Sequence, residues 1–575
     1  MIRFFLKGCL YFFKGILFYL NFFRYNDVMN IKKYLTNKLR KICLQVWPEL
    51  KEREFEFDIE YSPNKKFGDY STNIAMKLAP VLRRGPLEIA NDIKKNFGES
   101  PAIIKIEAVS PGFVNFFLDF GWLTKQVNSI LKDKEKWGAS EHGKNKKVQI
   151  EFISANPTGP ITLGNGRGGF SGDVLGNIMK LAGYRVQKEY YVNDVGNQVS
   201  ILAESVLRKY WRKQGIKIDY PDYCYQGKYV EELADKLFLP NYKISQMQNL
   251  EAVREKIKGR IMKRMINDIK KVCLNKFGIK FDNFFEEHTL YSSGTVDKML
   301  QQLKEKKLLY KAEGAIWLRT RKFGDDKDRV LVKASEEPVY FLSDIAYHWN
   351  KFAVRKFDRV IDVLGADHHG YVGRLQATMG IFEFAGQLDI IISQLVRLIK
   401  DGKEVKMSKR SGNFVTLEEV VDEAGLDATR FFFLMHDYST HMDFDMNLAK
   451  KRTKDNPVFY VQYAHARICS ILRKAKTLEV LPQKKGESIA EGEVALIKQL
   501  MKWPALVIEV SESYQVNKLT TYAIELSTAF HEFYTNFRVI QGKQVNERRL
   551  NIIKATQIVL KNVLTTMGIK APERM

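Results

Sequence analysis

Apolar positions along the chain change their spacing at several points, and these changes predict the order of the elements. Strand-like segments occur at FEFDIEY, AIIKIEAV and FVNFFL, and the segment IAMKLAPVL has apolar residues at helical spacing. Pro111–Gly112 turns the chain between the last two strand-like segments. We therefore expect a small α+β domain over residues 29–140, followed by a polar linker that ends near residue 147.

An apolar strand, VQIEFIS, then leads into a loop rich in Pro and Gly, ANPTGPITLGNGRGG, and a helical segment follows. Strand, glycine loop and helix in this order are typical of the start of a nucleotide-binding parallel sheet. Strand-like patterns return at AIWLRT, RVLVKA, RVIDVLG and DIIISQLVRLI. We expect a Rossmann-type parallel-sheet catalytic domain over residues 145–455, with a charged helical insertion at about 201–285.

From residue 456 to 575 the pattern is almost purely helical and predicts a separate all-α bundle. The predicted fold class is therefore multidomain α/β. A length of 575 residues fits three or four domains.

The first 28 residues differ from the rest of the chain. Phe4–Phe23 is crowded with apolar side chains, but Lys7 and Lys14 interrupt it, and the uncharged run Gly15–Phe23 is too short to span a bilayer. No small-residue cleavage site follows, as a signal peptide would require. Two interpretations remain: a weak membrane-surface anchor, or upstream sequence before a true start at Met29. We favour the second and expect no stable membrane association.

The net charge of the chain indicates what kind of partner it binds. Lys and Arg number 92 against 67 Asp and Glu, a net charge of +25 spread along the chain. Such a surface favours nucleic acid or an anionic membrane as a partner, although a general bias toward lysine explains it equally well. The five cysteines lie far apart in sequence, so we expect no structural zinc and no disulfide framework, but buried thiols in a reducing compartment, the cytoplasm.

The glycine loop is the first candidate site. Its glycines let backbone amides approach an anion, and the helix N-terminus behind them adds partial positive charge. Alone, the pattern also fits a tight turn between strand and helix. The wider segment SANPTGPITLGNGRG, however, resembles the nucleotide-binding signature of class I arginyl-tRNA synthetases. That family usually carries His-x-Gly-His here, whereas this chain has Thr162 and Asn165 in the two histidine places.

The resemblance implies that Thr162 and Asn165 are catalytic groups that donate hydrogen bonds to ATP phosphates. Neither can carry positive charge, so Arg167 is a candidate to supply it. VKMSKRSGN resembles the second class I signature and implies Lys406 and Lys409 as catalytic cations that stabilise the transition state. By itself, Lys-x-x-Lys is typical of solvated surface. The implied ATP-binding residues are Pro157, Gly159, Gly164, Gly166, Gly365, Asp367, Met407 and Ser408.

An arginine pocket needs a carboxylate for the guanidinium. In YFLSDIAYHW, Tyr340 and Asp344 are one helical turn apart, and the segment resembles the family's arginine-recognition helix. A capped helix with a buried tyrosine is the alternative. The arginine-binding residues that the resemblance implies are Glu151, Asn156, Tyr340, Asp344, Glu313 as a second carboxylate, and Gln376. His368 and His369 are expected to contact nucleotide or pack, not to bind metal, because adjacent side chains point apart.

The flanking segments resemble the family's tRNA-binding domains. FGDYSTNIAMKLA and VSPGFVNFFL are similar to the N-terminal domain that grips the outer corner of tRNA, and NPVFYVQYAHARICSIL to the start of the helical domain that reads the anticodon. Tyr460 and Tyr463 beside Arg467 are candidates for stacking on bases, and packing in the core explains them equally well.

The resemblance runs from about Met29 to Met575 and implies an arginine–tRNA ligase. Such an enzyme activates L-arginine with ATP and transfers it from arginyl-adenylate to the 3′-terminal ribose of tRNA(Arg), giving AMP and pyrophosphate. Mg²⁺ is expected with ATP, and tRNA is expected to be needed for the first step. We expect a monomer. The alternative is a non-catalytic tRNA-binding paralogue, which the loss of both signature histidines motivates.

Overall fold

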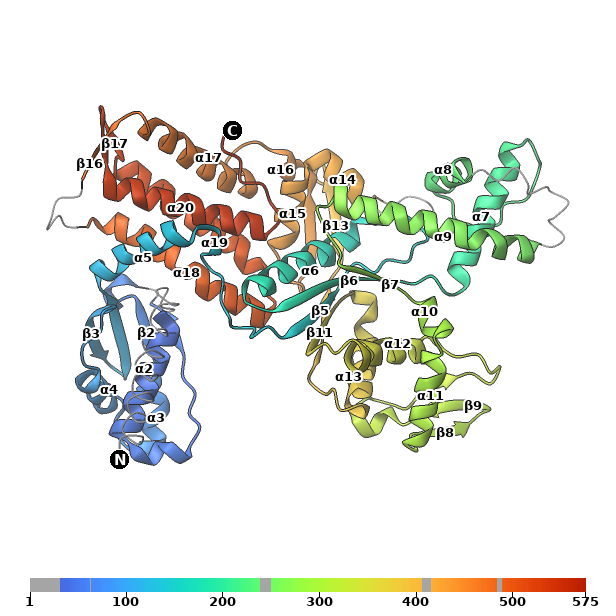
Figure 1. Ribbon diagram of the computed structural model, residues 1–575, viewed down its shortest axis with the longest axis horizontal. Coiled ribbons are helices and arrows are strands. Elements are labelled where there is room, and N and C mark those ends of the chain that lie inside the picture. The colour runs from blue at the N-terminus through green and yellow to red at the C-terminus, as the bar shows by residue number, and fades with distance from the viewer. Residues whose placement is uncertain (1–30, 63, 238–249, 406–414, 483–488) are drawn as a thin grey trace, which may run out of the picture.

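A computed structural model describes residues 31–62, 64–237, 250–405, 415–482 and 489–575 (Figure 1). The apolar extension 1–28 lies outside these residues. None of the described helices combines the length and the apolar character needed to cross a membrane. The four cysteines in the described part of the chain, Cys43, Cys224, Cys273 and Cys469, are buried free thiols.

The N-terminal part is an α+β unit built on an antiparallel sheet with the strand order β1-β2-β4-β3. Its apolar faces pack together around residues such as Leu35, Ile74 and Phe116, none of which is exposed to solvent. The elements are α2 (Ile31–Val46), β1 (Ile59–Tyr61), β2 (Tyr70–Thr72), α3 (Ile74–Leu82), α4 (Pro86–Asn96), β3 (Ile103–Val109), β4 (Phe113–Leu118) and α5 (Phe120–Asp133).

A five-stranded parallel sheet with the order β12-β11-β5-β6-β7 forms the centre of the molecule. Helix α6 (Leu163–Leu181) connects β5 to β6 in a βαβ unit. The predicted Rossmann-type sheet is confirmed. Strand β5 is buried along nearly its whole length, as expected for a strand between two parallel neighbours. The strands are β5 (Lys147–Glu151), β6 (Arg185–Val192), β7 (Asn283–Glu286), β11 (Arg359–Gly365) and β12 (Leu388–Ser393).

Two insertions leave this sheet. The first contains α7 (Asn197–Lys213), α8 (Lys228–Lys236) and α9 (Leu250–Asn275), which share a small core of their own and lie to the right in Figure 1. The charged segment was expected to be helical to about residue 285, but its last residues form β7 and extend the sheet.

The second insertion, between β7 and β11, carries α10 (His288–Ser292), α11 (Thr295–Glu305) and α12 (Tyr340–Trp349), whereas α13 (Val372–Ile381) connects β11 to β12. Its strands, β8 (Leu309–Ala312), β9 (Ala315–Leu318) and β10 (Arg329–Val332), pair antiparallel in a sheet of their own. The segments AIWLRT and RVLVKA are therefore strands, as predicted, but they are not part of the parallel sheet.

The chain then returns through β13 (Val396–Lys400), β14 (Lys403–Glu404), α14 (Leu417–Ala424), α15 (Leu426–Leu434), β15 (Met442–Asp445) and α16 (Met446–Lys450). The C-terminal part is the predicted helical bundle, with a short sheet of three strands added at one end. Its elements are α17 (Pro457–Ala475), β16 (Glu479–Leu481), α18 (Glu491–Ser513), α19 (Asn517–Asn536), β17 (Ile540–Gln541), β18 (Gln544–Asn546) and α20 (Glu547–Thr566).

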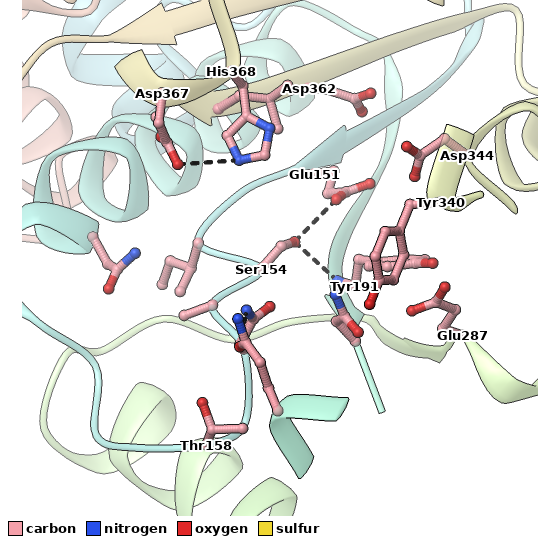
Figure 2. A pocket seen from close by; sticks show the side chains of 18 of the residues that line it. Glu151, Ser154, Thr158, Tyr191, Glu287, Tyr340, Asp344, Asp362, Asp367 and His368 are labelled. Carbon is pink, nitrogen blue, oxygen red and sulfur yellow. Dashed lines mark hydrogen bonds and ion pairs between the residues drawn. The ribbon is translucent and has the colours of Figure 1, made fainter. Parts of the chain in front are cut away.

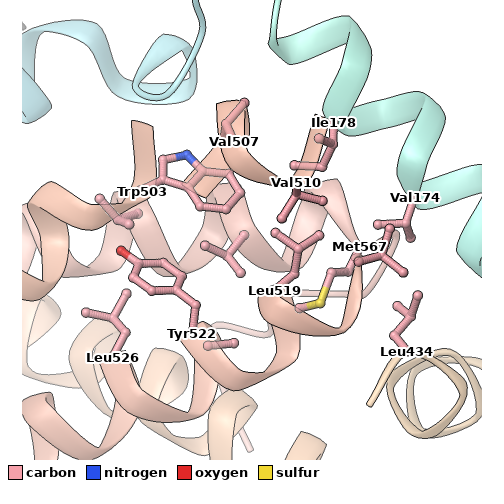
Figure 3. Packing of buried hydrophobic residues seen from close by; sticks show 14 of the residues in the cluster. Val174, Ile178, Leu434, Trp503, Val507, Val510, Leu519, Tyr522, Leu526 and Met567 are labelled. Carbon is pink, nitrogen blue, oxygen red and sulfur yellow. The ribbon is translucent and has the colours of Figure 1, made fainter. Parts of the chain in front are cut away.

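The bundle packs directly on the back of the nucleotide-type fold. Figure 3 shows Trp503 and Val510 of α18 in one cluster with Tyr522 of α19, and Val174 and Ile178 of α6 border the same cluster. Helix α6 therefore faces the sheet on one side and the bundle on the other. This explains why nearly all of its side chains are buried although its hydrophobic pattern is weak.

A buried ionic cluster joins the same three parts of the fold. Asp173 of α6 accepts hydrogen bonds from Lys188 Nζ of β6, at 2.6 Å, and from Arg430 Nη2 of α15. The Arg430 guanidinium also donates to the carbonyl oxygens of Met567, at 2.9 Å, and Phe277, at 2.8 Å. One carboxylate thus neutralises two buried cations from two different elements.

Asp173→Asn is expected to lower the free energy of unfolding by about 3 to 5 kcal/mol, because it leaves two buried cations facing each other without a carboxylate. The matched control is Asp443→Asn, which breaks a two-pronged but solvent-exposed pair with Arg397 and should cost far less, because water screens both charges. Urea denaturation measures both. Equal losses for the two variants would contradict the role of Asp173.

Candidate active site

A pocket of about 740 Å³ opens where the parallel strands end (Figure 2). Glu151 is the last residue of β5, Glu287 follows β7, and Gly365 is the last residue of β11, and all three line it. The carboxyl ends of parallel strands meet at one edge of a sheet, which is where such folds hold their ligands. Helix α12 closes the pocket on the side of β11.

Nine of the predicted site residues contribute to the wall of this pocket. They come from the end of β5 and the glycine loop that follows it, from α12, and from the end of β11 with the two residues after it, three regions that are far apart in sequence. These residues are Glu151, Asn156, Gly159, Thr162, Asn165, Tyr340, Asp344, Gly365 and Asp367.

Three predicted ATP contacts in the glycine loop do not line the pocket. Pro157 is buried, and Gly164 is exposed on the first turn of α6. Gly166 faces the protein interior, where an added Cβ would lie 2.7 Å from Leu417 Cδ1 and 3.1 Å from Phe433. Gly166 therefore allows α6 to pack closely against α14 and α15, a steric reason that does not involve a phosphate.

Two predicted arginine contacts also lie elsewhere. Glu313 is in the turn between β8 and β9, with a positive φ of 52° and an exposed side chain. Gln376 is exposed on α13 and is not part of the pocket wall, although its neighbour Leu375 is. Glu313 is not part of the pocket wall, because its hairpin belongs to the separate antiparallel sheet and not to the parallel one.

Lys406, Met407, Ser408 and Lys409 lie outside the described residues, so their roles stay predictions. The described residues that follow them contact the glycine loop. Leu163 N donates to Val415 O at 3.2 Å, and Leu417 N donates to Ile161 O at 2.9 Å. The chain that leaves the lysine segment is thus hydrogen-bonded to the loop that starts α6.

The Asn165 side chain caps the start of α6 through Thr162. Asn165 Oδ1 accepts from Thr162 N at 3.2 Å and from Thr162 Oγ1 at 2.9 Å. The side-chain oxygen is therefore occupied, while the amide NH₂ of Asn165 makes no hydrogen bond to any described residue. Since Asn165 lines the pocket, its two N–H groups are available to an anion there.

Arg167 cannot supply the missing positive charge in the pocket. Its side chain is buried, and its guanidinium donates to the carbonyl oxygens of Thr440, at 2.5 Å, Asp437 and Gln394. Burial lowers its pKa. Arg167 thus holds the segment around Thr440 against α6, and the candidate compensating role is wrong.

Tyr340 and Asp344 are on the same face of α12, as predicted, and Glu287 lies beside them (Figure 2). Ser343 Oγ donates to Glu287 Oε1 at 3.2 Å. Burial raises the pKa of Asp344, and burial together with the charge of Asp344 raises the pKa of Glu287 to about 7. Two carboxyl groups that share one buried space are suited to a planar cation that donates to both.

Glu287 was missed by the sequence analysis. It follows a short apolar strand, NFFE, which ends a long charged segment and was taken as part of the helical insertion. The sequence does contain one indication of Glu287, namely an acidic residue directly after a strand of the parallel sheet. This indication can be used only when the pairing of β7 with β6 is known.

The exposed histidines and the aromatic candidates have distinct places. His368 lines the pocket with its Nε2 3.6 Å from Asp367 Oδ2, whereas His369 is exposed outside it. On the bundle, Tyr463 is exposed, and Arg467 Nη1 donates to its hydroxyl at 2.9 Å. Tyr460 instead packs against the core, with its hydroxyl 3.2 Å from Thr528 Oγ1.

Family models match three consecutive stretches of the chain. The arginyl-tRNA synthetase N-terminal domain matches residues 29–118, the catalytic domain of class I tRNA synthetases (R) matches 126–439, and the DALR anticodon-binding domain matches 461–575. The three together cover most of the chain.

Individual proteins match over nearly the same range. An arginine–tRNA ligase of Geobacter sp. (strain M21) is 43% identical over 531 residues, 90% of this chain and 95% of the relative. That of Anoxybacillus flavithermus is 42% identical over 563 residues, covering 96% of this chain and all of the relative. Among solved structures, Thermus thermophilus arginyl-tRNA synthetase has a TM-score of 0.75 at 20% identity and covers 95% of this chain and 100% of its own. At this identity the likeness shows the fold.

Gly166→Ala is expected to lower the free energy of unfolding by about 1 to 3 kcal/mol, because the new methyl group overlaps Leu417 and Phe433. The control is Gly164→Ala two residues earlier, where the nearest atom is 4.0 Å away. Both changes raise helix propensity equally, so the difference between their urea midpoints isolates packing. If Gly166→Ala were as stable as Gly164→Ala, the steric explanation would be wrong.

Proposed function

The chain belongs to the arginyl-tRNA synthetase family, and from this we propose how its residues divide the work of the reaction. The protein is an arginine–tRNA ligase, which uses ATP to activate L-arginine and transfers the arginyl group to tRNA(Arg). The match of N-terminal, catalytic and anticodon-binding models in one chain carries this conclusion. It does not favour the alternative, a non-catalytic paralogue.

In the first step the carboxylate of arginine attacks the α-phosphate of ATP, and pyrophosphate leaves. Such a transfer depends on positioning and on groups that face the growing charge. We assign Asn165 Nδ2 as a neutral phosphate donor, joined by the Thr162 hydroxyl once it turns away from Asn165 Oδ1, and Lys406 and Lys409 as the cations. Gly159 lets the loop approach the phosphates. ATP enters as its Mg²⁺ complex, so Mg²⁺ belongs to the substrate.

Gly365 and Asp367 receive the ribose of ATP. An added Cβ on Gly365 would lie 2.5 Å from Asp367 Oδ1, so glycine leaves room for that carboxylate beside the end of β11. The hydroxyl groups of the ribose donate hydrogen bonds, and the Asp367 carboxylate accepts them.

For arginine we assign the guanidinium to Asp344 and Glu287, with the Tyr340 hydroxyl beside them. Two carboxylates can accept several of its five N–H donors in one plane. Glu151 and Asn156, at the other end of the pocket, receive the α-ammonium group. The amide of Asn156 is already oriented by Gln198, whose Oε1 accepts from it at 2.8 Å.

We divide the chain at 29–140, 145–455 and 456–575, and propose that the first and last parts hold tRNA(Arg). Tyr463 with Arg467 is the exposed aromatic group on the bundle that could stack on a base. A monomer in the cytoplasm is our expectation for the working enzyme.

ATP–pyrophosphate exchange tests this function. The purified protein should exchange pyrophosphate only when arginine and tRNA(Arg) are both present. Asn165→Ala should reduce the exchange rate by roughly 10²-fold or more, the usual cost of losing one donor that faces transition-state charge.

Glu419→Ala is the matched control for Asn165→Ala. Glu419 is the third residue of α14, and its Oε2 accepts from Thr416 N at 2.7 Å, as Asn165 Oδ1 does from Thr162 N. Both variants therefore lose a helix cap, but only Asn165 is in the pocket wall. If the wild type showed no ATP–pyrophosphate exchange with arginine and tRNA(Arg) present, the proposed function would be wrong. If Asn165→Ala and Glu419→Ala had equal exchange rates, the assignment of Asn165 as a phosphate donor would be wrong.

The Michaelis constant for arginine should depend on pH. A carboxyl group with a pKa raised to about 7 is protonated below pH 7 and then cannot accept from the guanidinium. The constant should therefore rise as pH falls from 8 to 6, approaching roughly tenfold per pH unit below the pKa. Glu287→Gln should raise it at pH 8 and flatten its pH dependence, while the constant for ATP stays level. A flat profile in the wild type would rule out Glu287 as a guanidinium ligand.

A further inference from the structure

Beneath the pocket lies a buried group of charges that the assigned roles do not use. Lys351 belongs to η6 (Asn350–Val354), a π-helical turn that continues α12. Its ammonium is completely buried, 2.7 Å from Glu151 Oε2 and 2.8 Å from Asp362 Oδ1. A buried lysine is costly unless it is fully paired, and here two carboxylates from two strands pair with it. Their charges outweigh the effect of burial and raise the pKa of Lys351.

His348, one turn before Lys351, binds the same carboxylate. Its Nε2 is 2.7 Å from Asp362 Oδ2, and its Nδ1 is 2.7 Å from the carbonyl oxygen of Asp344. Burial would raise the pKa of Asp362, but Lys351 and His348 outweigh it and hold that pKa well below its ordinary value. Asp362 is therefore an ionised acceptor.

A carbonyl oxygen cannot donate a hydrogen bond either, so both ring nitrogens of His348 face acceptors. These two acceptors are on different elements, Asp344 on α12 and Asp362 on β11. His348 and Lys351 thus meet at Asp362, and we call these two side chains the clamp.

Other ionisable groups surround the clamp. Glu151 and Asp362 face it from β5 and β11. A third carboxylate, Glu189 of β6, is paired with the Arg355 guanidinium at 3.0 Å. The Tyr347 hydroxyl lies between, 2.8 Å from Glu151 Oε2 and 2.6 Å from Glu189 Oε1. Three carboxylates, Lys351, Arg355 and the His348 ring thus share the floor, and the titratable neighbour above it is Asp344 of α12.

The clamp connects the two ends of the proposed arginine site. At one end, Glu151 Oε2 is fixed by Lys351 and Tyr347, and Glu151 Oε1 accepts from Ser154 Oγ at 3.0 Å. At the other end, Asp344 is on the helix that His348 ties to β11 through Asp362. The clamp therefore ties β5, which carries Glu151, and α12, which carries Asp344, to one carboxylate on β11.

We propose that Lys351 and His348 are positioning residues that set the length of the arginine pocket and thereby its preference for a side chain of three methylenes. This inference rests on the proposed assignment of Glu151 and Asp344 to opposite ends of the substrate. In this scheme neither Lys351 nor His348 touches arginine or ATP. The two side chains act by fixing the distance between the carboxylates of Glu151 and Asp344, which do contact arginine.

The test compares arginine with two homologues, one methylene shorter and one methylene longer. Arginine is measured as the substrate of tRNA charging, through its Michaelis constant. Each homologue is measured as a competitive inhibitor, through its inhibition constant. A rigid pocket separates such homologues by about 10- to 200-fold. Lys351→Met keeps the length of the side chain but removes its charge. It should reduce the preference for arginine over both homologues at least about tenfold, with a smaller change in the Michaelis constant for ATP.

Lys188→Met is the matched control, because Lys188 is also a buried lysine, 2.6 Å from a carboxylate, Asp173. Asp173 does not line the pocket, whereas Glu151 and Asp362, the partners of Lys351, do. Both variants should melt at a lower temperature, and only Lys351→Met should lose selectivity. His348→Gln, which retains a donor for Asp362 but not the second contact of the ring with the Asp344 carbonyl oxygen, should reduce selectivity in the same direction. It carries the test if Lys351→Met does not fold.

If Lys351→Met changed the Michaelis constant for arginine and the inhibition constants of both homologues in the same proportion, the clamp would support only the fold. A loss of selectivity in Lys188→Met equal to that in Lys351→Met would also overturn the proposal. Either result leaves arginine charging by the wild type intact. A failure of the function itself would appear instead as a wild type with no arginine-dependent exchange.

Discussion

A charge that is taken out of water needs an opposite charge at hydrogen-bonding distance, and this requirement organises the catalytic part of the chain. Asp173 meets it behind the glycine loop by joining α6 to β6 and α15. Asp362 meets it beneath the pocket by joining β11 to α12 and, through Lys351, to β5. In each case one carboxylate held by two side chains fixes elements that the chain brings together from distant positions. The hydrophobic core determines which layers pack, and these two carboxylates determine how the layers are aligned.

The two ends of the pocket follow different chemistry as a result. At the phosphate end the described donors are a hydroxyl and an amide, which have no charge to gain or lose near neutral pH. At the guanidinium end, Asp344 and Glu287 share a buried space and both have raised pKa values. Recognition of the amino acid is therefore the electrostatically sensitive part of the site, while the loop that receives the phosphates depends on local hydrogen-bond geometry.

Features that depend on residues close together in the sequence could be predicted from the sequence alone. The parallel sheet, the glycine loop, the helical bundle and the pairing of Tyr340 with Asp344 on one helix face all follow from short-range spacing. Glu287 could not be found in this way, because its position depends on β7 joining the sheet after an insertion of about 90 residues. Glu313 and Arg167 were misplaced for a related reason: the strand containing a residue and the burial of its side chain are properties of the assembled fold. One signal was available and not used, the polar stripe Tyr340, Asp344, His348 and Lys351 at helical spacing.

The two positions of the cap at the start of α6 do not carry equal weight. Asn165 Oδ1 accepts from the backbone N of residue 162, a bond that any side chain at 162 leaves in place, and from the Thr162 hydroxyl. A change at 165 therefore removes the helix cap and the amide that faces the pocket together. A change at 162 removes only one of the two bonds, so the start of α6 tolerates variation at 162 more readily than at 165.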